Sequence, residues 1–410
     1  MMFAGMFILL FGVVGTAVDF GRWLSVRDNT LRAMDAAVLA AGRAMQINGI
    51  SNTEALEVAR RYFDENKNGR LDYENVTFQL EQNGTVIASI SQSAVNTPFL
   101  GIIGVSQLEV NAVSRAILAA GGNSGTNIEI SMMLDTTGSM GWEGKMADLK
   151  AAAKDLVDIV VWDDQSQYSS RIALAPFSEH VNVGRDYYLG VTHRSSIPGK
   201  KNKRTCVRER RSSSKRYTDD APDYAGRFNR YPGGGKCKTS NEIVPLTNDK
   251  ALLKGRIDKL ETTGGTAGHL GTAWAWNLLS PNFNTLWSSA SHADPYSHLN
   301  QVNTVSHGDQ TLEVPVLKKI AVLMTDGVYN RKYTGSNSDV QAKASCTAMK
   351  NKGIEIYAIG FKLPSSGNAY DVMEHCASSE QHFYDADDGD ELRMAFRDIA
   401  LKISTLRLME

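Results

Sequence analysis

The stretch Ile128–Met140, with the sequence IEISMMLDTTGSM, decides the fold of this chain. Its first seven residues form a mostly apolar run of strand length, and a short polar segment follows at once. Similar apolar runs recur downstream, separated by stretches with helical periodicity. The expected strands are 128–134, 172–176, 320–325 and 354–361, and the expected helices are 145–161, 341–350 and 391–406. Apolar strands that alternate with helices predict an α/β fold, a doubly wound and mainly parallel sheet covered on both faces.

Three segments at the expected strand ends and helix starts carry oxygen-bearing side chains. The first strand ends in Asp135-Thr-Thr-Gly-Ser139, a helix opens after Thr263-Gly-Gly-Thr266, and the 320–325 strand leads into Asp326-Gly327. In open α/β sheets, ligands bind at the carboxyl ends of the strands, where we expect these residues to meet. Carboxylates and hydroxyls without His or Cys make a hard site that suits Mg²⁺, Mn²⁺ or Ca²⁺.

The three segments together resemble the metal-ion-dependent adhesion site of a von Willebrand factor type A domain. The shared motifs are D-x-[ST]-x-S, a downstream G-G-T, and a strand that ends in T-D-G. The resemblance implies five metal ligands in three loops: Asp135, Thr137, Ser139, Thr266 and Asp326. It also implies a divalent metal, Mg²⁺ ahead of Mn²⁺ or Ca²⁺, that completes its coordination with an acidic residue of a partner protein.

The N-terminal stretch 1–18, MMFAGMFILLFGVVGTAV, contains no charged residue, and Asp19 is the first charge. As a helix this stretch is about 27 Å long, at the short end of what crosses a membrane. No Lys or Arg precedes the apolar run, which argues against a signal peptide, so we expect an uncleaved transmembrane anchor. The arginines that follow at positions 22, 27 and 32 favour a cytoplasmic C-terminal side by the positive-inside rule.

A small α+β module is expected over 19–120. The apolar stripe of 24–45 predicts that the N-terminal helix continues to about Gln46, as in a pilin stem. The other expected elements are a helix over 53–63, a hairpin of 76–80 and 85–90 around Asn83-Gly84, and a strand over 108–118. The Gly-rich segment 121–126 is expected to be a linker to a second domain over 127–410.

The N-terminal segment is similar to the TadE/TadG-like pilus-assembly family of bacteria. The similarity rests on Ala17-Val-Asp-Phe-Gly-Arg22 and on the Ala-rich Asp35–Ala41. Members that resemble TadG fuse this segment to a von Willebrand factor type A domain, so the similarity spans nearly the whole chain. It implies a single-pass protein of the bacterial inner membrane, with the large C-terminal domain in the periplasm or otherwise outside the cytoplasm, which is opposite to the orientation that the arginines after the span favour. The implied function is non-enzymatic: assembly or anchoring of a tight-adherence pilus, with pilus-assembly components as partners.

Four cysteines allow three disulfide pairings. We favour Cys206–Cys237 and Cys346–Cys376, each of which closes a loop of about 30 residues and contributes roughly 3 kcal/mol. Buried free thiols are the alternative, and they suit Cys346 and Cys376 better than the pair in the polar loop. Disulfides would place the large domain in an oxidising compartment. Zinc is not expected, because no C-x-x-C and no Cys/His pair at ligand spacing occurs.

The 410 residues have a net charge of −1, and their hydrophobic and charged fractions of 42% and 22% exclude wholesale disorder. The charge is uneven, because Arg194–Lys238 holds fourteen Lys and Arg residues and only four acidic ones. We expect this segment to belong to a long basic insertion at about 186–250. One interpretation is a solvated, disulfide-tied loop without a ligand, and the other is a surface that binds acidic polymer, anionic lipid or an acidic protein. Nucleic acid is not expected, since no nucleic-acid-binding signature accompanies the segment.

Enzymatic function is not expected. The chain contains no G-x-S-x-G, P-loop, H-E-x-x-H or Rossmann G-x-G-x-x-G motif. His269 is the candidate general base nearest in sequence to the expected metal ligands, and a surface position on a helix explains it more simply. Two alternatives to pilus assembly stay open: a surface adhesin that contacts host or substratum, and an envelope anchor that binds acidic cell-wall polymer through Arg194–Lys238.

Overall fold

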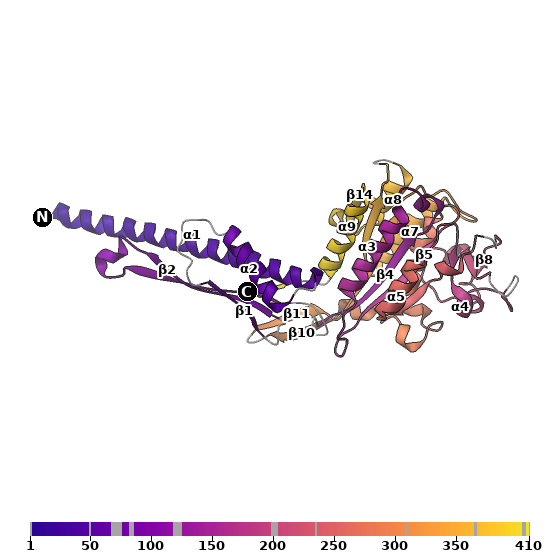
Figure 1. Ribbon diagram of the computed structural model, residues 1–410, viewed down its shortest axis with the longest axis horizontal. Coiled ribbons are helices and arrows are strands. Elements are labelled where there is room, and N and C mark those ends of the chain that lie inside the picture. The colour runs from indigo at the N-terminus through magenta and orange to yellow at the C-terminus, as the bar shows by residue number, and fades with distance from the viewer. Residues whose placement is uncertain are drawn as a thin grey trace. The chain divides into compact units, whose positions relative to one another are not determined.

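The computed structural model describes residues 2–48, 51–66, 76–81, 86–117, 125–197, 204–233, 236–307, 310–364, 367–403 and 407–409. The chain divides into two compact units. The first unit comprises Met1–Ala120 and Ser404–Glu410, and the second comprises Gly121–Ile403. Figure 1 traces the course of the chain through each unit.

The first unit packs two helices on an antiparallel sheet. Helices α1 (Met2–Asn48) and α2 (Asn52–Asn66) lie against strands in the order β1-β2-β3-β15. The strands are β1 (Val76–Glu81), β2 (Val86–Asn96), β3 (Gln107–Ile117) and β15 (Arg407–Met409), with the 3-10 helix η2 (Leu100–Ile103) between β2 and β3. Met34 and Val38 of α1 pack with Phe63 of α2 and with Phe78 and Ile87 of the sheet. The small Ala residues of α1 that join this core allow close approach of the helix.

The N-terminal part of α1 contacts a loop of its own unit. The backbone N–H groups of Phe99 and Leu100 donate to Asp19 Oδ2 at 2.9 and 2.7 Å. A Cβ at Gly15 would lie 2.7 Å from the Phe99 side chain, so this residue packs tightly on the same loop. Within the described residues, no helix is both long and apolar enough to cross a membrane. The span expected over 1–18 falls mostly on residues 1–13, whose side chains lie outside the described set.

The second unit is built on one mixed sheet, with strands in the order β14-β13-β12-β4-β5-β6-β7-β8 and with β9 paired to β5. The strands are β4 (Asn127–Asp135), β5 (Ser170–Phe177), β6 (Val181–Asn182), β7 (Cys206–Arg210), β8 (Phe228–Arg230), β9 (Val244–Thr247), β12 (Leu317–Thr325), β13 (Glu355–Phe361) and β14 (Phe383–Ala386). Strands β14, β13, β12, β4 and β5 run parallel, whereas β6 to β9 pair antiparallel. Strands β10 (Val302–His307) and β11 (Gln310–Pro315) form a separate hairpin.

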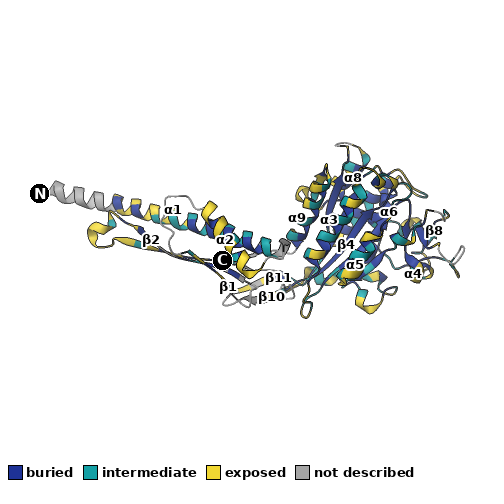
Figure 2. Cartoon of the chain, viewed as in Figure 1, coloured by how far each residue is buried: buried dark blue, intermediate teal, exposed yellow. Residues whose placement is uncertain are grey.

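Helices cover both faces of this sheet. One face carries α3 (Lys145–Val160), α5 (Lys250–Asp258) and α9 (Gly389–Ile403), and the other carries α6 (Gly268–Leu279), α7 (Ser338–Asn351) and α8 (Asn368–Cys376). Side chains alternate along β4, so Met132 and Leu134 join the first layer while Met133 joins the second. Figure 2 shows the central strands as bands of buried residues. The expected α/β class, with strands buried on both faces, is confirmed.

Two expected domain boundaries differ from the structure or fall outside it. Strand β15 pairs antiparallel with β3 of the first unit, whereas the sequence assigned the whole of 127–410 to the second domain. The added strand gives β3 hydrogen-bond partners on both sides, which no local pattern near the C-terminus reveals. Most of the expected linker, 121–126, lies outside the described residues.

The expected basic insertion at 186–250 is largely part of the fold rather than a solvated loop. It supplies helix α4 (Gly184–Val191) and strands β7, β8 and β9. Arg210 is 3% exposed, lies 4.7 Å from the Phe228 ring and donates to the Gly226 carbonyl at 2.7 Å. Further basic side chains pair with acidic ones within the unit: Lys215–Asp220, Lys236–Glu179 and Lys238–Glu261. A charge count does not show that Arg210 is buried beside an aromatic ring or that carboxylates of the same unit pair with these lysines.

The two favoured disulfides are confirmed. Cys206 bonds to Cys237, and Cys346 bonds to Cys376, and the described chain contains no free cysteine. The first disulfide ties β7 to the loop before β9, and the second joins α7 to α8 in the core.

Candidate metal centre

The five residues expected to bind a metal lie at one edge of the sheet of the second unit. Asp135 is the last residue of β4, Asp326 follows β12 directly, and Thr266 shortly precedes α6. Because β4 and β12 are adjacent parallel strands, their carboxyl ends bring both carboxylates to the same side. Thr137 and Ser139 stand in the tight turn that follows β4.

Asp135 is fully buried, and both of its carboxylate oxygens accept hydrogen bonds. The Thr137 N–H donates to Oδ1 at 2.8 Å, and the Thr325 hydroxyl donates to Oδ2 at 2.7 Å. Thr325 is the last residue of β12, so the neighbouring strand holds this carboxylate in place. The turn after β4, which carries Thr137 and Ser139 and is called the first loop below, therefore follows a carboxylate whose orientation is fixed.

Hydroxyl groups connect the first loop to Asp326. Ser139 Oγ donates to Asp326 Oδ1 at 2.6 Å, and it lies 2.9 Å from Thr137 Oγ1. The Lys145 ammonium at the start of α3 donates to the other oxygen, Asp326 Oδ2, at 3.0 Å. Both oxygens of this buried carboxylate thus have partners within the chain.

Gly327 lies where the second loop, which carries Thr266 before α6, approaches the first loop and the third loop, which follows β12 and carries Asp326. A Cβ at this position would lie 3.4 Å from Ser139 Oγ and 3.7 Å from Thr266 Oγ1, so the two hydroxyls approach the same small residue. The backbone of Thr266 is fixed, since its N–H donates to Asn330 Oδ1 at 3.1 Å and its carbonyl accepts from Arg331 at 2.9 Å. The structure thereby brings all five residues into one cluster.

This cluster holds more negative than positive charge. Lys145 pairs with Asp326, but Asp135 has no ion pair among the residues that the structure describes. Burial, followed by the nearby Asp326 charge, raises the pKa of Asp135 to about 7. Two desolvated carboxylates surrounded by hydroxyls are an environment that a hard divalent cation stabilises. The donor set of Asp135, Thr137, Ser139, Thr266 and Asp326 therefore fits Mg²⁺, Mn²⁺ or Ca²⁺.

Two stretches of the chain match known families. Residues 1–44 match the Flp pilus-assembly TadE/G-like family, and residues 297–398 match the von Willebrand factor type A (VWA) domain. The chain joins a TadE/G-like segment to a VWA domain. The matched part of the VWA domain contains Asp326, while the other four residues of the cluster precede it in the sequence.

The chain is also similar to several solved structures, whereas no curated protein matches it. The pilus adhesin SpaC from Lactobacillus rhamnosus GG is 12% identical, with 80% of this chain and 34% of that chain covered and a TM-score of 0.40. The von Willebrand factor domain of the type V pili tip protein Mfa5 from Porphyromonas gingivalis is 14% identical, with coverages of 68% and 96% and a TM-score of 0.40. Proximal thread matrix protein 1 from the mussel byssus is 17% identical, with coverages of 70% and 48% and a TM-score of 0.36. This chain spans about a third of SpaC and about half of the byssus protein.

Backbone hydrogen bonds join the first and second loops of the VWA domain. The Gly138 N–H donates to the Gly264 carbonyl at 3.0 Å, and the Thr263 N–H donates to the Thr136 carbonyl at 2.8 Å. Asn241 reinforces this junction, because its amide donates to Thr136 Oγ1 at 3.1 Å. The loops that carry Thr137 and Thr266 are thus held in register by the chain itself.

Glu179, which the sequence analysis did not single out, ties the second loop to the basic segment. Its Oε1 accepts from the Tyr231 hydroxyl at 2.5 Å and from Lys236 Nζ at 3.0 Å, while its Oε2 accepts from the Gly265 N–H at 3.3 Å. Gly264 has φ +69°, and a Cβ there would lie 2.9 Å from Glu179 Cγ, so only glycine fits. The available signal was the position of this carboxylate just after the end of β5.

His269 is buried, so the expectation of a surface position is wrong. It is 3% exposed, its Nδ1 lies 2.7 Å from Ser338 Oγ, and its Nε2 lies 3.1 Å from Glu209 Oε1. Glu209 comes from β7 and Ser338 from α7, so both partners are distant in sequence. These bonds satisfy both ring nitrogens, and His269 joins α6 to the basic segment of the VWA domain.

Proposed function

We propose that this chain is a non-enzymatic pilus-assembly or anchoring protein of the bacterial cell envelope, whose VWA domain captures an acidic residue of a partner protein through a divalent metal. The residues that would hold the metal are Asp135, Thr137, Ser139, Thr266 and Asp326. When bound, the metal supplies a coordination position for a carboxylate oxygen of the partner. The observation that carries the proposal is the convergence of three loops, with oxygen donors only, around two buried carboxylates.

The residues of the chain prepare this site before any partner arrives. Thr325 and the Thr137 N–H fix the orientation of Asp135, and Ser139 fixes one oxygen of Asp326. The hydrogen bond between Gly138 and Gly264 holds the loops together at 3.0 Å. Such preorganisation lowers the entropy lost when a ligand is bound, because the donors are already in place.

The place of action and the class of partner rest on other features. Two disulfides are typical of proteins that fold in an oxidising compartment, which supports a position outside the cytoplasm. The TadE/G-like match at residues 1–44 supports pilus-assembly components as partners.

The proposal is tested by capture of envelope proteins with the tagged full-length chain, in Mg²⁺ and in the presence of a chelator. We expect pilus components to be recovered in Mg²⁺ only, and Asp135→Ala to abolish their recovery. Asp371→Ala, which changes an exposed carboxylate of α8, is the matched control and should capture as well as the wild type. Thermal unfolding of each variant establishes that the fold survives.

The result distinguishes this function from that of a surface adhesin. An adhesin would bind host cells or a substratum in a chelator-sensitive manner without recovering pilus components. Recovery that is unchanged by chelator and by Asp135→Ala contradicts capture through the metal.

A further inference from the structure

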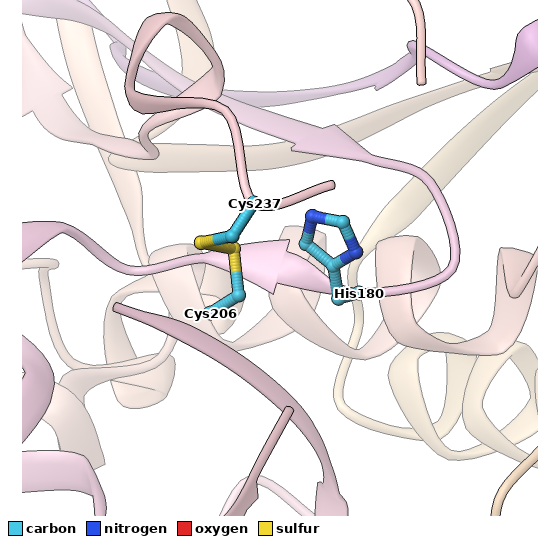
Figure 3. Close-up of side chains that lie close together, drawn as sticks. All are labelled: His180, Cys206 and Cys237. Carbon is cyan, nitrogen blue, oxygen red and sulfur yellow. A yellow bond between two sulfur atoms is a disulfide. The ribbon is translucent and has the colours of Figure 1, made fainter. Parts of the chain in front are cut away.

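His180, Cys206 and Cys237 come together at the antiparallel edge of the VWA sheet. His180 immediately precedes β6, Cys206 opens β7, and Cys237 lies in the loop before β9. One ring nitrogen and the two sulfur atoms lie within 4.8 Å of one another, and Figure 3 shows the imidazole beside the disulfide. The three residues are 4%, 1% and 9% exposed. None of them belongs to the cluster around Asp135, so this is a second, separate group of residue types that can serve as metal ligands.

The His180 imidazole is suited to bind a metal. Burial lowers the pKa of His180 to about 4, so the ring is neutral and keeps a lone pair at neutral pH. The Tyr231 ring stacks on the imidazole with 4.4 Å between centroids and holds it beside the sulfurs.

We propose that the chain, once the Cys206–Cys237 disulfide is reduced, binds one Zn²⁺ through these two thiolates and the His180 imidazole. Two thiolates and one imidazole form an established zinc donor set, in which the fourth position is left to water or another ligand. Only the thiolate form of cysteine is a metal ligand, so the oxidised pair does not bind and the redox state controls the site. The Cys346–Cys376 disulfide has no equivalent histidine cluster among the described residues.

A dithiol reductant gives two electrons and two protons to the Cys206–Cys237 bond and is itself converted to a disulfide. Zn²⁺ then binds as the two thiols release their protons to solvent. A disulfide oxidant reverses the process: it takes two electrons from the thiolates and two protons from solvent and becomes a dithiol, while the Cys206–Cys237 bond reforms and Zn²⁺ is released.

Cobalt titration of the full-length chain tests the proposal. The protein is reduced with dithiothreitol, separated from it without oxygen, and titrated with Co²⁺, whose thiolate charge-transfer absorption reports sulfur ligation alone. We expect one equivalent of this absorption in the reduced chain, none in the oxidised chain, and its loss when Zn²⁺ is added. Co²⁺ bound by the oxygen donors around Asp135 gives no such absorption. His180→Ala should weaken the affinity at least about tenfold, while His375→Ala, beside the other disulfide, should leave it unchanged.

Alkylation of the reduced wild-type chain gives a second measurement that needs no variant. Zn²⁺ should slow modification of Cys206 and Cys237 at least about tenfold, as located by peptide mass mapping, and should leave Cys346 and Cys376 unaffected. Equal alkylation of Cys206 and Cys237 with and without Zn²⁺ overturns the proposal. A thiolate–cobalt absorption that survives His180→Ala undiminished overturns it as well.

Discussion

Lys145→Met should tighten metal binding by the VWA domain, because Lys145 places a positive charge where a divalent ion would compete for Asp326. The two side chains form an ion pair at 3.0 Å, in which Lys145 is 13% exposed and the Asp326 carboxylate is fully buried. At an effective dielectric constant of about 20, two unit charges about 4 Å apart interact by about 4 kcal/mol. Lys145 can turn toward solvent when the metal ion binds, so we expect the repulsion between its ammonium group and the ion to weaken Mg²⁺ binding by only about 1–2 kcal/mol. That range corresponds to a Mg²⁺ affinity about five- to thirtyfold higher in the variant.

Isothermal titration calorimetry of Mg²⁺ into chelator-treated protein measures this change. Lys154→Met is the matched control, because Lys154 lies on the same helix and pairs with Asp258 at 2.7 Å at an exposed site. Its loss should leave the affinity within about twofold of the wild type, since exposed ion pairs contribute little. In chelator, Lys145→Met should also lower the unfolding temperature, because Asp326 loses its cation. Unchanged or weaker Mg²⁺ binding by Lys145→Met would refute the competition between ammonium and metal.

Two further predictions concern buried charges of the same domain. Glu129→Ala should lower the free energy of unfolding by about 3–5 kcal/mol, because it leaves the buried Lys319 ammonium without its carboxylate. Urea unfolding measures this loss. The control is Asp163→Ala, whose side chain is 92% exposed in its pair with Lys250 and whose effect should stay within about 0.5 kcal/mol. Equal losses in the two variants would contradict the prediction. Burial opposes ionisation of Glu209, but hydrogen bonds from His269 and a backbone N–H outweigh it and hold its pKa below 4.5. The stability that this lowered pKa contributes is complete above pH 4.5 and is lost as the pH falls through the folded-state pKa of Glu209. Glu209→Gln should therefore make the unfolding temperature fall less steeply with decreasing pH in the acid range. An equally steep fall in the variant would contradict this.

The fold of the second unit was largely predictable because its central strands are buried on both faces. Such strands appear in the sequence as short, mostly apolar runs, and those expected at 128–134 and 320–325 lie within β4 and β12. The gathering of Asp135 and Asp326 at one edge then follows from the parallel pairing of these two strands.

The contacts between distant segments were not predictable. Glu209 on β7 and Ser338 on α7 contact His269 although both are distant from it in the sequence. No local sequence pattern predicts that the imidazole is buried between them. The position of Lys145 against Asp326 likewise depends on how α3 packs after the first loop. His180 approaches Cys206 only because β6 pairs with β7.

The net charge of a single segment was the least reliable guide. The dense basic composition of Arg194–Lys238 suggested either a solvated loop or a surface for an acidic ligand, yet Arg210 is buried against Phe228. Composition does not report which other part of the chain covers a segment.

Direct titration of Mg²⁺ into the full-length protein tests the central claim, that Asp135 and its four neighbours hold a divalent metal. We expect one binding event in the wild type, its loss in Asp135→Ala, and full retention in Asp371→Ala, with all three proteins folded by near-ultraviolet circular dichroism. A wild type that binds neither Mg²⁺ nor Mn²⁺, or a folded Asp135→Ala variant that binds Mg²⁺ as tightly as the wild type, would contradict it.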